Sequence, residues 1–439
     1  MRNPILAALL ASAFFSLNAG ATDLLQVYKD ALANDAQFAS ARSALTAGQE
    51  KAVQGRAGLL PTIGLSGSDT RSRVTSQSDL PVPDRTGTTT TNSWTLGLTQ
   101  PLFRWGNWEQ YEQSKLSVVA SEAQFAQSRQ DLIVRVGQAY FDVLAAQDTL
   151  ATLQAQKIAT GEQLASAKRN FEVGTSTITD THEAQARYDL ITAQEFAAQS
   201  DLQVKRSALQ QIIGKEAGDL ATLKSGVKLS APQPNGINEW VSTAEKQNYS
   251  VVASEVNVEI SKRSIALSRA GHYPTLDLVV STGRTSIGGN PVSSGVTKPT
   301  TIGVNWSVPI FAGFAVDSKV KESIALEEKA RNDLEVARRA AAQGARQAYT
   351  GVTSGLAQVK AYEAAEISSQ SALDSNKLGY QVGVRINIDV LNAQQQLYTT
   401  RQTLAKARYD TILNGLRLKS AAGILKEDDL LEINALLQK

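Results

Sequence analysis

The chain has 439 residues, with 44 lysine and arginine residues against 42 aspartate and glutamate residues, two histidines and no cysteine. The formal net charge of +2 gives no reason to expect a nucleic acid as a partner. The lack of cysteine excludes disulfide frameworks, thiolate metal sites and cysteine nucleophiles, and two histidines leave little for an imidazole-based metal site. Aromatic residues make up only 6% of the chain, which suits long helices packed through small side chains better than several compact cores.

Residues 1–21 have the features of a cleaved secretory signal. Arg2 supplies positive charge, residues 5–17 form an apolar run broken only by small residues, and Ala19-Gly20-Ala21 has the form of a signal-peptidase site. The apolar run is too short to span a bilayer, and no later stretch approaches the length of about 18 apolar residues that a transmembrane helix needs. The sequence therefore predicts an exported chain, and any part that enters a membrane is expected to do so as β-strands.

Several short motifs occur twice, at a nearly constant offset. RAGLLPTI at 56–63 is similar to RAGHYPTL at 269–276, PLF at 101–103 to PIF at 309–311, and FEVG at 171–174 to YQVG at 380–383. One offset that holds across unrelated motifs indicates a duplication. We expect two structural repeats, 22–229 and 238–439, joined by a linker rich in proline and glycine at 230–237.

Both repeats show the same predicted order of elements. Each repeat begins with a helical segment, at 23–57 in the first and 238–271 in the second. Two strands with alternating apolar residues follow, expected at about 61–71 and 92–103 in the first repeat and at about 273–284 and 300–311 in the second. The loops between the paired strands are expected at 73–91 and 287–299. A long helix without proline follows (107–172; 315–381), then a turn at Gly174 or Gly383 and a return helix, at about 180–214 in the first repeat. Heptad spacing from Leu132 to Leu153 indicates coiled-coil packing, so the predicted fold is mostly α with a small β contribution.

The four predicted strands have the length of transmembrane β-strands, about 9–11 residues. Trp94, Trp105 and Trp306 are placed to supply aromatic side chains at the membrane interface. Four strands cannot close a barrel alone, so a barrel would need strands from several chains. A small soluble sheet is the alternative.

Taken together, these motifs resemble the TolC-type family of outer-membrane channel proteins over essentially the whole mature chain. The resemblance rests on the RAGxxPT segments, on PLF and PIF, on FEVGTSTITD at 171–180 and YQVGVRINID at 380–389, and on KSAAG at 419–423. It implies a homotrimer in which each chain gives four strands to one twelve-stranded barrel in the bacterial outer membrane, with a helical tunnel extending into the periplasm. The implied function is an exit duct for tripartite efflux pumps, for type I protein secretion, or for both.

The same resemblance implies partners and excludes chemistry. The expected partners are a periplasmic membrane-fusion adaptor, an inner-membrane pump of the resistance–nodulation–division or ATP-binding cassette type, and outer-membrane lipid. No cofactor is implied, and the sequence has no GxSxG, P-loop, HExxH or Rossmann motif, so an enzyme is not expected. The alternative is a secreted fibrous coiled-coil protein with a structural or adhesive role, which would explain the helices but not the duplicated strands.

The resemblance also implies a gate at the periplasmic helix turns. In the closed tip of the family, the residue at Asp180 bonds the residue at Tyr380, and the residue at Arg385 reaches the neighbouring chain near Thr179. Such charge-assisted hydrogen bonds would bias a two-state gate towards the closed state. The alternative is that Asp180 and Asp389 are N-cap residues of the helices that follow the turns.

Two aspartate rings, three residues apart, narrow the tunnel in this family. Asp389 matches one ring, whereas Asn392 stands where the second aspartate is expected. Three carboxylates in place of six predict weaker cation binding at this constriction. His182, two residues after Asp180, is either a group that makes opening sensitive to pH or a solvated surface imidazole.

Overall fold

The computed structural model describes residues 21–76, 85–224, 226–289 and 294–438. The predicted signal sequence, apart from its last residue, lies outside the described residues, as do parts of both predicted strand-connecting loops. The chain forms two compact units, one of Met1–Arg42, Ala126–Tyr249 and Arg338–Lys439 and one of Ser43–Phe125 and Ser250–Ala337. No helix within the described ranges combines the length and the apolar character that a bilayer crossing requires.

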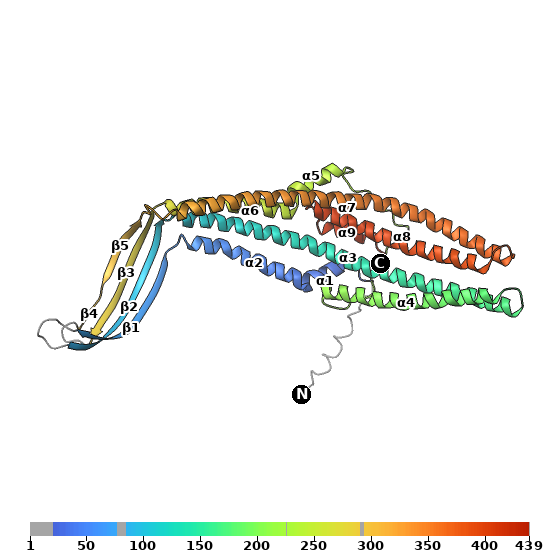
Figure 1. Ribbon diagram of the computed structural model, residues 1–439, viewed down its shortest axis with the longest axis horizontal. Coiled ribbons are helices and arrows are strands. Elements are labelled where there is room, and N and C mark those ends of the chain that lie inside the picture. Colours follow the sequence, from blue (N-terminus) through green and yellow to red (C-terminus); the bar gives the residue numbers. More distant parts are fainter. Residues whose placement is uncertain (1–20, 77–84, 225, 290–293, 439) are drawn as a thin grey trace, which may run out of the picture. The chain divides into compact units, whose positions relative to one another are not determined.

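The second unit contains an antiparallel sheet (Figure 1). Its strands are β1 (Thr62–Ser76), β2 (Arg85–Phe103), β3 (Thr275–Gly288), β4 (Gly295–Thr297) and β5 (Thr300–Ser307). β1 pairs with β2, β2 with β3, and β3 with both β4 and β5. The described residues therefore hold four long strands, as predicted, and one additional strand of three residues.

The first hairpin is longer than the sequence predicts. β1 continues to Ser76 and β2 begins at Arg85, so both strands extend into the segment 73–91 that was expected to be a loop. The segment after Arg85 is rich in threonine, whose branched Cβ favours extended backbone over a flexible loop.

The two faces of this sheet differ in polarity. The register places Ile63, Leu98, Val280 and Ile302 in one row across the four long strands, and the outer two side chains are 68% and 75% exposed. Alternate residues point to the opposite face, where β1 and β2 pair serine and threonine, as in the contact of 3.2 Å between the Oγ atoms of Ser68 and Ser93. The sheet thus has an exposed apolar face and a face of small hydroxyl side chains.

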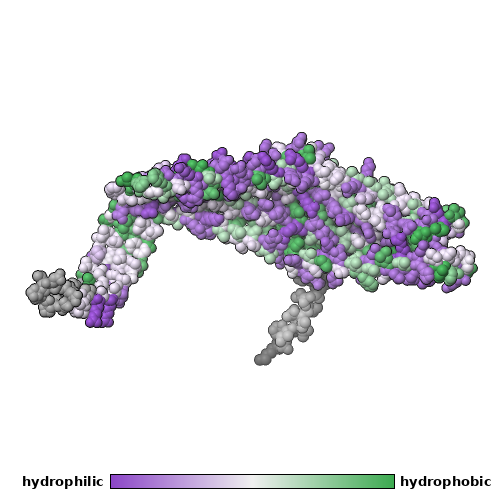
Figure 2. Space-filling view, in the orientation of Figure 1, coloured by the Kyte–Doolittle hydropathy of each residue, from purple (hydrophilic) through white to green (hydrophobic). Residues whose placement is uncertain are grey.

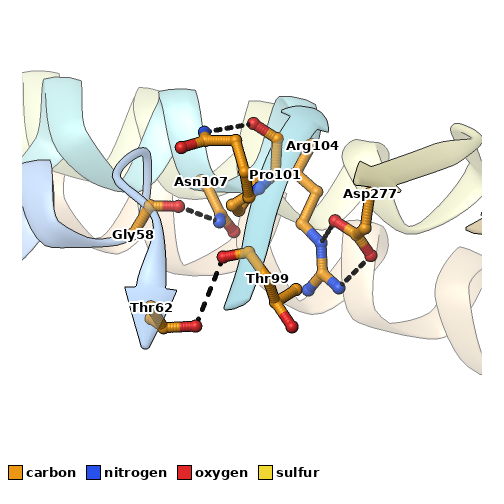
Figure 3. Close-up of polar contacts among 8 residues, drawn as sticks. Gly58, Thr62, Thr99, Pro101, Arg104, Asn107 and Asp277 are labelled. Carbon is orange, nitrogen blue, oxygen red and sulfur yellow. Dashed lines mark hydrogen bonds and ion pairs between the residues drawn. The ribbon is translucent and has the colours of Figure 1, made fainter. Parts of the chain in front are cut away.

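Polar contacts fix the place where β2 ends and a long helix begins (Figure 3). The guanidinium of Arg104 donates to both carboxylate oxygens of Asp277 on β3, at 2.7 and 2.6 Å, so that the end of β2 is tied to its neighbouring strand. Asn107 donates to the carbonyl oxygen of Gly58, which links the start of the helix to the segment before β1. These bonds hold the sheet against the helices of its own unit.

The helices α3 (Trp105–Glu172) and α7 (Ala315–Gln381) confirm the prediction of two long helices. In the second unit, α2 (Ala36–Ala57) approaches α3 closely at two glycines. A Cβ atom at Gly48 would lie 2.3 Å from Oγ of Ser121, and one at Gly55 would lie 2.1 Å from Oγ of Ser114. Glycine is required at both positions because any side chain would force the helices apart.

The prediction of one continuous helix at 23–57 is wrong. α1 (Leu24–Asn34) ends at Asp35, whose ψ of 115° is extended, and α2 starts beyond it. The Asp35 carboxylate accepts a bond of 2.6 Å from the amide of Phe38 and two bonds of 3.0 Å from Arg135, so the break is stabilised by an N-terminal cap and an ion pair.

The segment 238–271 is also broken. α5 (Ile237–Gln247) ends at Asn248, whose ψ is 129°, and α6 (Tyr249–Arg269) and the 3₁₀ turn η1 (Ala270–His272) follow. Nδ2 of Asn248 donates to the carbonyl oxygen of Ala421 at 2.9 Å. The helical period continues across such a break, so the periodicity of the sequence did not reveal it.

The first unit is a helical layer that carries the two helix turns. It contains the later parts of α3 and α7 together with the return helices α4 (Ile178–Ile213) and α8 (Asn387–Ala421) and the short α9 (Asp428–Asn434). Its core includes Leu132, Val136 and Val143 of the predicted heptad run, all at most 1% exposed. The segment before α9 is bound to the rest of this unit through Glu427, which accepts bonds from Tyr28 at 2.9 Å and Arg129 at 2.7 Å.

Candidate functional site

The turn between α3 and α4 is closed by glycine and by a capping box. Gly174 has a φ of 80°, which a residue with a side chain rarely adopts, and the amide of Thr175 donates to the carbonyl oxygen of Asn170 at 2.8 Å. Thr177 is the N-cap of α4: its Oγ1 accepts from the amide of Asp180, and the Asp180 carboxylate accepts from the amide of Thr177 at 3.1 Å. Every one of these bonds is local to this turn.

The turn between α7 and α8 has the same backbone and a different cap. Gly383 has a φ of 78°, and the amide of Val384 donates to the carbonyl oxygen of Gly379 at 2.8 Å. The N-cap of α8 is Ile386, whose side chain offers no acceptor. The amide of Asp389 donates to the carbonyl oxygen of Ile386 at 3.2 Å.

The proposal that Asp180 and Asp389 are N-cap residues is wrong. Both lie three residues after the N-cap, in the first helical turn, where a carboxylate still interacts favourably with the helix dipole. The caps themselves are Thr177 and Ile386.

A cleft of about 760 Å³ lies between the two turns. Asp180, Tyr380, Gly383 and Arg385 all line it, so four of the predicted site residues are brought together. Its lining also includes Gln163, Ser166, Asn170, Thr175, Ser176, Thr177, Lys377, Gln381, Ile386 and Asn387. The remaining predicted site residues, Thr179, His182, Asp389, Asn392 and Gly174, are not part of this lining. Thr179 and His182 are exposed on α4.

Within the cleft of the single chain, Tyr380 and Asp180 are not bonded to each other as expected. The expected contact of Arg385 with a neighbouring chain stays a prediction. The hydroxyl of Tyr380 accepts a bond of 3.0 Å from Nδ2 of Asn170 on α3, whereas the Asp180 carboxylate is engaged in its own capping box. Arg385 lies 3.7 Å from Asp389, one turn further along α8. The link between α3 and α7 is therefore made by an amide and a phenol rather than by a carboxylate.

Asn387 is a further residue of this site, which the sequence analysis missed. It is the first residue of α8 and is 1% exposed. Its Nδ2 donates to the carbonyl oxygen of Asp180 on α4 at 3.1 Å, and its Oδ1 accepts from Nε2 of Gln163 on α3 at 2.5 Å. Asn387 thus joins both helices of the α3–α4 pair to the start of α8. Its signal in the sequence is a polar residue between two isoleucines.

Asn392, predicted to lie at the constriction, also contacts the α3–α4 pair. Arg187 of α4 donates from Nη2 to Oδ1 of Asn392 at 3.0 Å and from Nη1 to Oε1 of Gln395. An apolar cluster of Leu164, Ala167, Ala184 and Leu391 also packs between α3, α4 and α8. Asn392 was predicted from the sequence, whereas its cationic partner Arg187 was not.

The ends of the turns expose apolar side chains. Val173 is 73% exposed in the first turn, and Val382 and Val384 are 65% and 77% exposed in the second. Figure 2 shows hydrophobic surface at the tips of the helix pairs, where these turns lie. Clustered exposed apolar side chains are uncommon on the surface of a protein that has no partner.

Within the described ranges, no group of three or more histidine, aspartate or glutamate residues is placed to hold a metal ion.

Comparisons with known proteins agree in one family. A family model described as outer membrane efflux protein matches residues 27–215 and 240–424. The outer membrane protein TolC of Escherichia coli strain K12 is 34% identical over 451 residues, which cover 99% of this chain and 89% of that protein. The proteases secretion protein PrtF of Dickeya chrysanthemi is 31% identical over 98% of this chain and 95% of its own.

A solved structure shares the fold. The Campylobacter jejuni CmeC outer membrane channel superposes with a TM-score of 0.79 at 18% identity and covers 94% of this chain and 90% of its own. With the family model matching most of the chain and relatives above 30% identity along nearly its full length, the chain is a protein of the bacterial outer membrane and belongs to the outer membrane efflux protein family.

Proposed function

We propose that three copies of this outer-membrane exit duct form one channel, which serves efflux pumps, type I secretion, or both. The observation that carries the proposal is the sheet. Among the described strands, β1 pairs with β2 alone and β5 with β3 alone, so the sheet of a single chain has two open edges. Open edges are not tolerated in a bilayer, and joining β1 of one copy to β5 of the next removes them.

The polarity of the sheet supports this assembly. The exposed row from Ile63 to Ile302 is suited to lipid, and the serine and threonine face is suited to a water-filled interior. Three chains with four long strands each would give twelve strands in one barrel. A secreted fibrous protein would have no use for an exposed apolar sheet face.

Two repeats, 22–229 and 238–439 with a linker at 230–237, fit the same proposal. The family model matches the chain in two successive ranges, 27–215 and 240–424. Both repeats break their first helix, at Asp35 and at Asn248, and both turn at a glycine with positive φ. These parallels support a duplication in which each repeat supplies two long strands and one helix turn.

The helix turns are the proposed gate and docking end. Opening would separate the α3–α4 pair from the α7–α8 pair, and this requires breaking the bonds made by Asn170, Asn387 and Arg187. The exposed valines of the turns are suited to an adaptor protein, which would offset the energy of those bonds. A pump of the inner membrane would then deliver the substrate. The relative PrtF is named for protease secretion, and the relative ArpC of Pseudomonas putida for antibiotic efflux, so both kinds of export stay within the proposal.

Single-channel conductance in a planar bilayer tests the proposal. The purified protein is compared with a Tyr380→Phe, Arg385→Ser double variant, in which Asn170 loses its acceptor and Asp389 loses its neighbouring cation. We expect a small, steady conductance for the parent and a several-fold larger one for the variant. A Tyr349→Phe, Arg417→Ser variant is the matched control, because it changes the same residue types away from the turns.

The outcomes separate the channel from the gate. A large conductance already present in the parent would leave the channel standing and reject a gate at the turns. If neither protein inserts or conducts, the sheet is not part of a membrane barrel, and the fibrous alternative is favoured. Sedimentation of the protein in detergent checks the trimer independently.

A further inference from the structure

Arg187 occupies an unusual electrostatic position. It lies on α4, and its two hydrogen-bond acceptors on α8 are the neutral amide oxygens of Asn392 and Gln395. Among the described residues, no carboxylate forms a salt bridge with Arg187. Two acidic residues of the same helices are engaged with other cations: Glu195 of α4 lies 2.8 Å from Lys157, and Asp389 of α8 lies 3.7 Å from Arg385. Glu183, one helical turn before Arg187 on α4, forms no salt bridge with it within the described ranges. The guanidinium of Arg187 is therefore hydrogen-bonded to neutral groups and has no direct ion-pair partner.

The bond also fixes which way the two amides face. A guanidinium has only donors, so each amide must turn its oxygen towards Arg187. The NH₂ groups of Asn392 and Gln395 then point away from the arginine, and within the described part of the chain neither has a hydrogen-bond acceptor. Both amide residues are exposed in the single chain. One charged and two neutral donor groups thus lie together, one helical turn beyond Asp389.

We propose that Arg187 is a specificity-determining residue, which with the NH₂ groups of Asn392 and Gln395 makes this constriction a site for anions. The inference rests on the proposed function and on the prediction from the sequence that position 392 lies at a constriction of the tunnel, where three copies would bring these groups to one ring. Rings of arginine and lysine favour anions, as rings of aspartate and glutamate favour cations. An aspartate at position 392 would pair with Arg187 and cancel its charge; the asparagine present here leaves that charge active. The class of solute selected is therefore small or extended molecules that carry carboxylate, phosphate or sulfonate groups.

The reversal potential of single channels in a potassium chloride gradient tests the inference, on the full-length protein in a planar bilayer. We expect Arg187→Gln to lower the ratio of chloride to potassium permeability by about threefold or more, because it removes the charge of the ring. Asn392→Asp is also expected to lower the ratio of chloride to potassium permeability. Arg187→Lys keeps the charge and should retain most of the parental ratio, which separates the role of the charge from that of the hydrogen bonds.

Arg417→Gln is the matched control. Arg417 donates to amide oxygens of Gln138 and Asn414, as Arg187 does to its own two amides, but lies near the other end of α8. Its removal changes the net charge by the same amount and should leave the permeability ratio unchanged. Ferrocyanide added at the periplasmic side is a second probe, and it should block the parent more strongly than the Arg187→Gln channel.

The results distinguish this inference from the proposed function. Channels that conduct, with a permeability ratio and a ferrocyanide block that Arg187→Gln does not change, would overturn the anion site and leave the duct intact. An equal shift in the Arg417→Gln control would also overturn it, because the effect would then follow net charge rather than place. If the parent forms no channel at all, the proposed function fails and the anion site fails with it.

Discussion

The α3–α4 turn and the α7–α8 turn share one backbone and are held in different ways. Each turn places a glycine at the same point, with φ of 80° at Gly174 and 78° at Gly383. The first turn is then completed by its own residues, through the Thr177 and Asp180 capping box. The second has an apolar N-cap, and the next residue, Asn387, makes its bonds to the other helix pair.

This difference separates two physical tasks. A local cap stabilises a turn wherever the turn lies, whereas the bonds of Asn387 exist only while the two helix pairs stay together. In the proposed gate, opening would therefore break the bonds of Asn387 and leave the capping box of the first turn intact. The bonds of Asn387 also join neutral groups, so breaking them exposes no unpaired ion.

Of the substitutions at the two turns, removal of the Asn387 side chain should have the largest effect. Asn387→Ala removes the acceptor of the Gln163 amide and one of the two donors to the carbonyl oxygen of Asp180, and the loss of these two partly buried bonds costs about 1–3 kcal/mol. We expect amide hydrogen exchange to become about tenfold faster or more at both turns, together with a larger conductance. Asn376→Ala is the control, because Asn376 is only partly buried and its side chain bonds only within α7. If exchange rises at the second turn alone, Asn387 does not join the two pairs.

Substitution of either turn glycine should destabilise its turn to the same extent, because both turns have the same backbone conformation. Gly174→Ala and Gly383→Ala each place a side chain in the left-handed region, at about 1–2 kcal/mol, and neither new Cβ meets an atom within 4 Å. The cost is therefore one of backbone conformation alone. Exchange protection of the turn amides measures it, and asparagine at either position should recover part of the loss. Clearly unequal effects of the two alanines would mean that the turns are not equivalent.

Loss of the capping box should have a smaller and strictly local effect. Thr177→Ala removes the acceptor for the amide of Asp180, which costs about 1 kcal/mol. We expect faster exchange in the first turn of α4, no change around Gly383 and an unchanged conductance, and Thr177→Ser should restore protection. An increase in conductance would show that the first turn also takes part in gating.

The pattern of the sequence was sufficient for the long helices, the long strands and the place of both turns, because all three depend on local period and on glycine. It did not reveal the helix breaks, since Asp35 and Asn248 interrupt the chain without interrupting its apolar spacing. It also pointed to Asp180 as the partner of Tyr380, a contact that Asn170 makes instead, and it did not indicate the contacts of Asn387 and Arg187. Those contacts join residues more than 200 positions apart, and a neutral amide gives no charge pattern by which to find its partner.

The smallest expected effect is a loss of stability at low pH, which should arise from carboxyl groups of the first unit that lie away from the turns. Burial alone would raise the pKa of the Asp35 carboxyl, but the bonds from Arg135 and from the amide of Phe38 lower it below its usual range. Bonds from Arg129 and Tyr28 likewise lower the pKa of Glu427, against a smaller opposing contribution from burial. A carboxyl whose pKa is lower in the folded chain stabilises the fold above its unfolded pKa, and this stabilisation is lost as the pH falls through the folded value.

Stability should therefore fall below about pH 4, the ordinary range of these carboxyl groups, while the amide bonds between the helix pairs do not titrate. The measurement is thermal unfolding by circular dichroism between pH 7 and pH 2, with conductance followed over the same range. An Asp35→Asn, Glu427→Gln variant should be less stable at pH 7 and lose less on acidification than the parent. If the conductance of the parent rises at the same pH at which its stability falls, then a carboxylate takes part in closing the turns. In that case it would be wrong that acid weakens the first unit while leaving the contacts between the two helix turns unchanged.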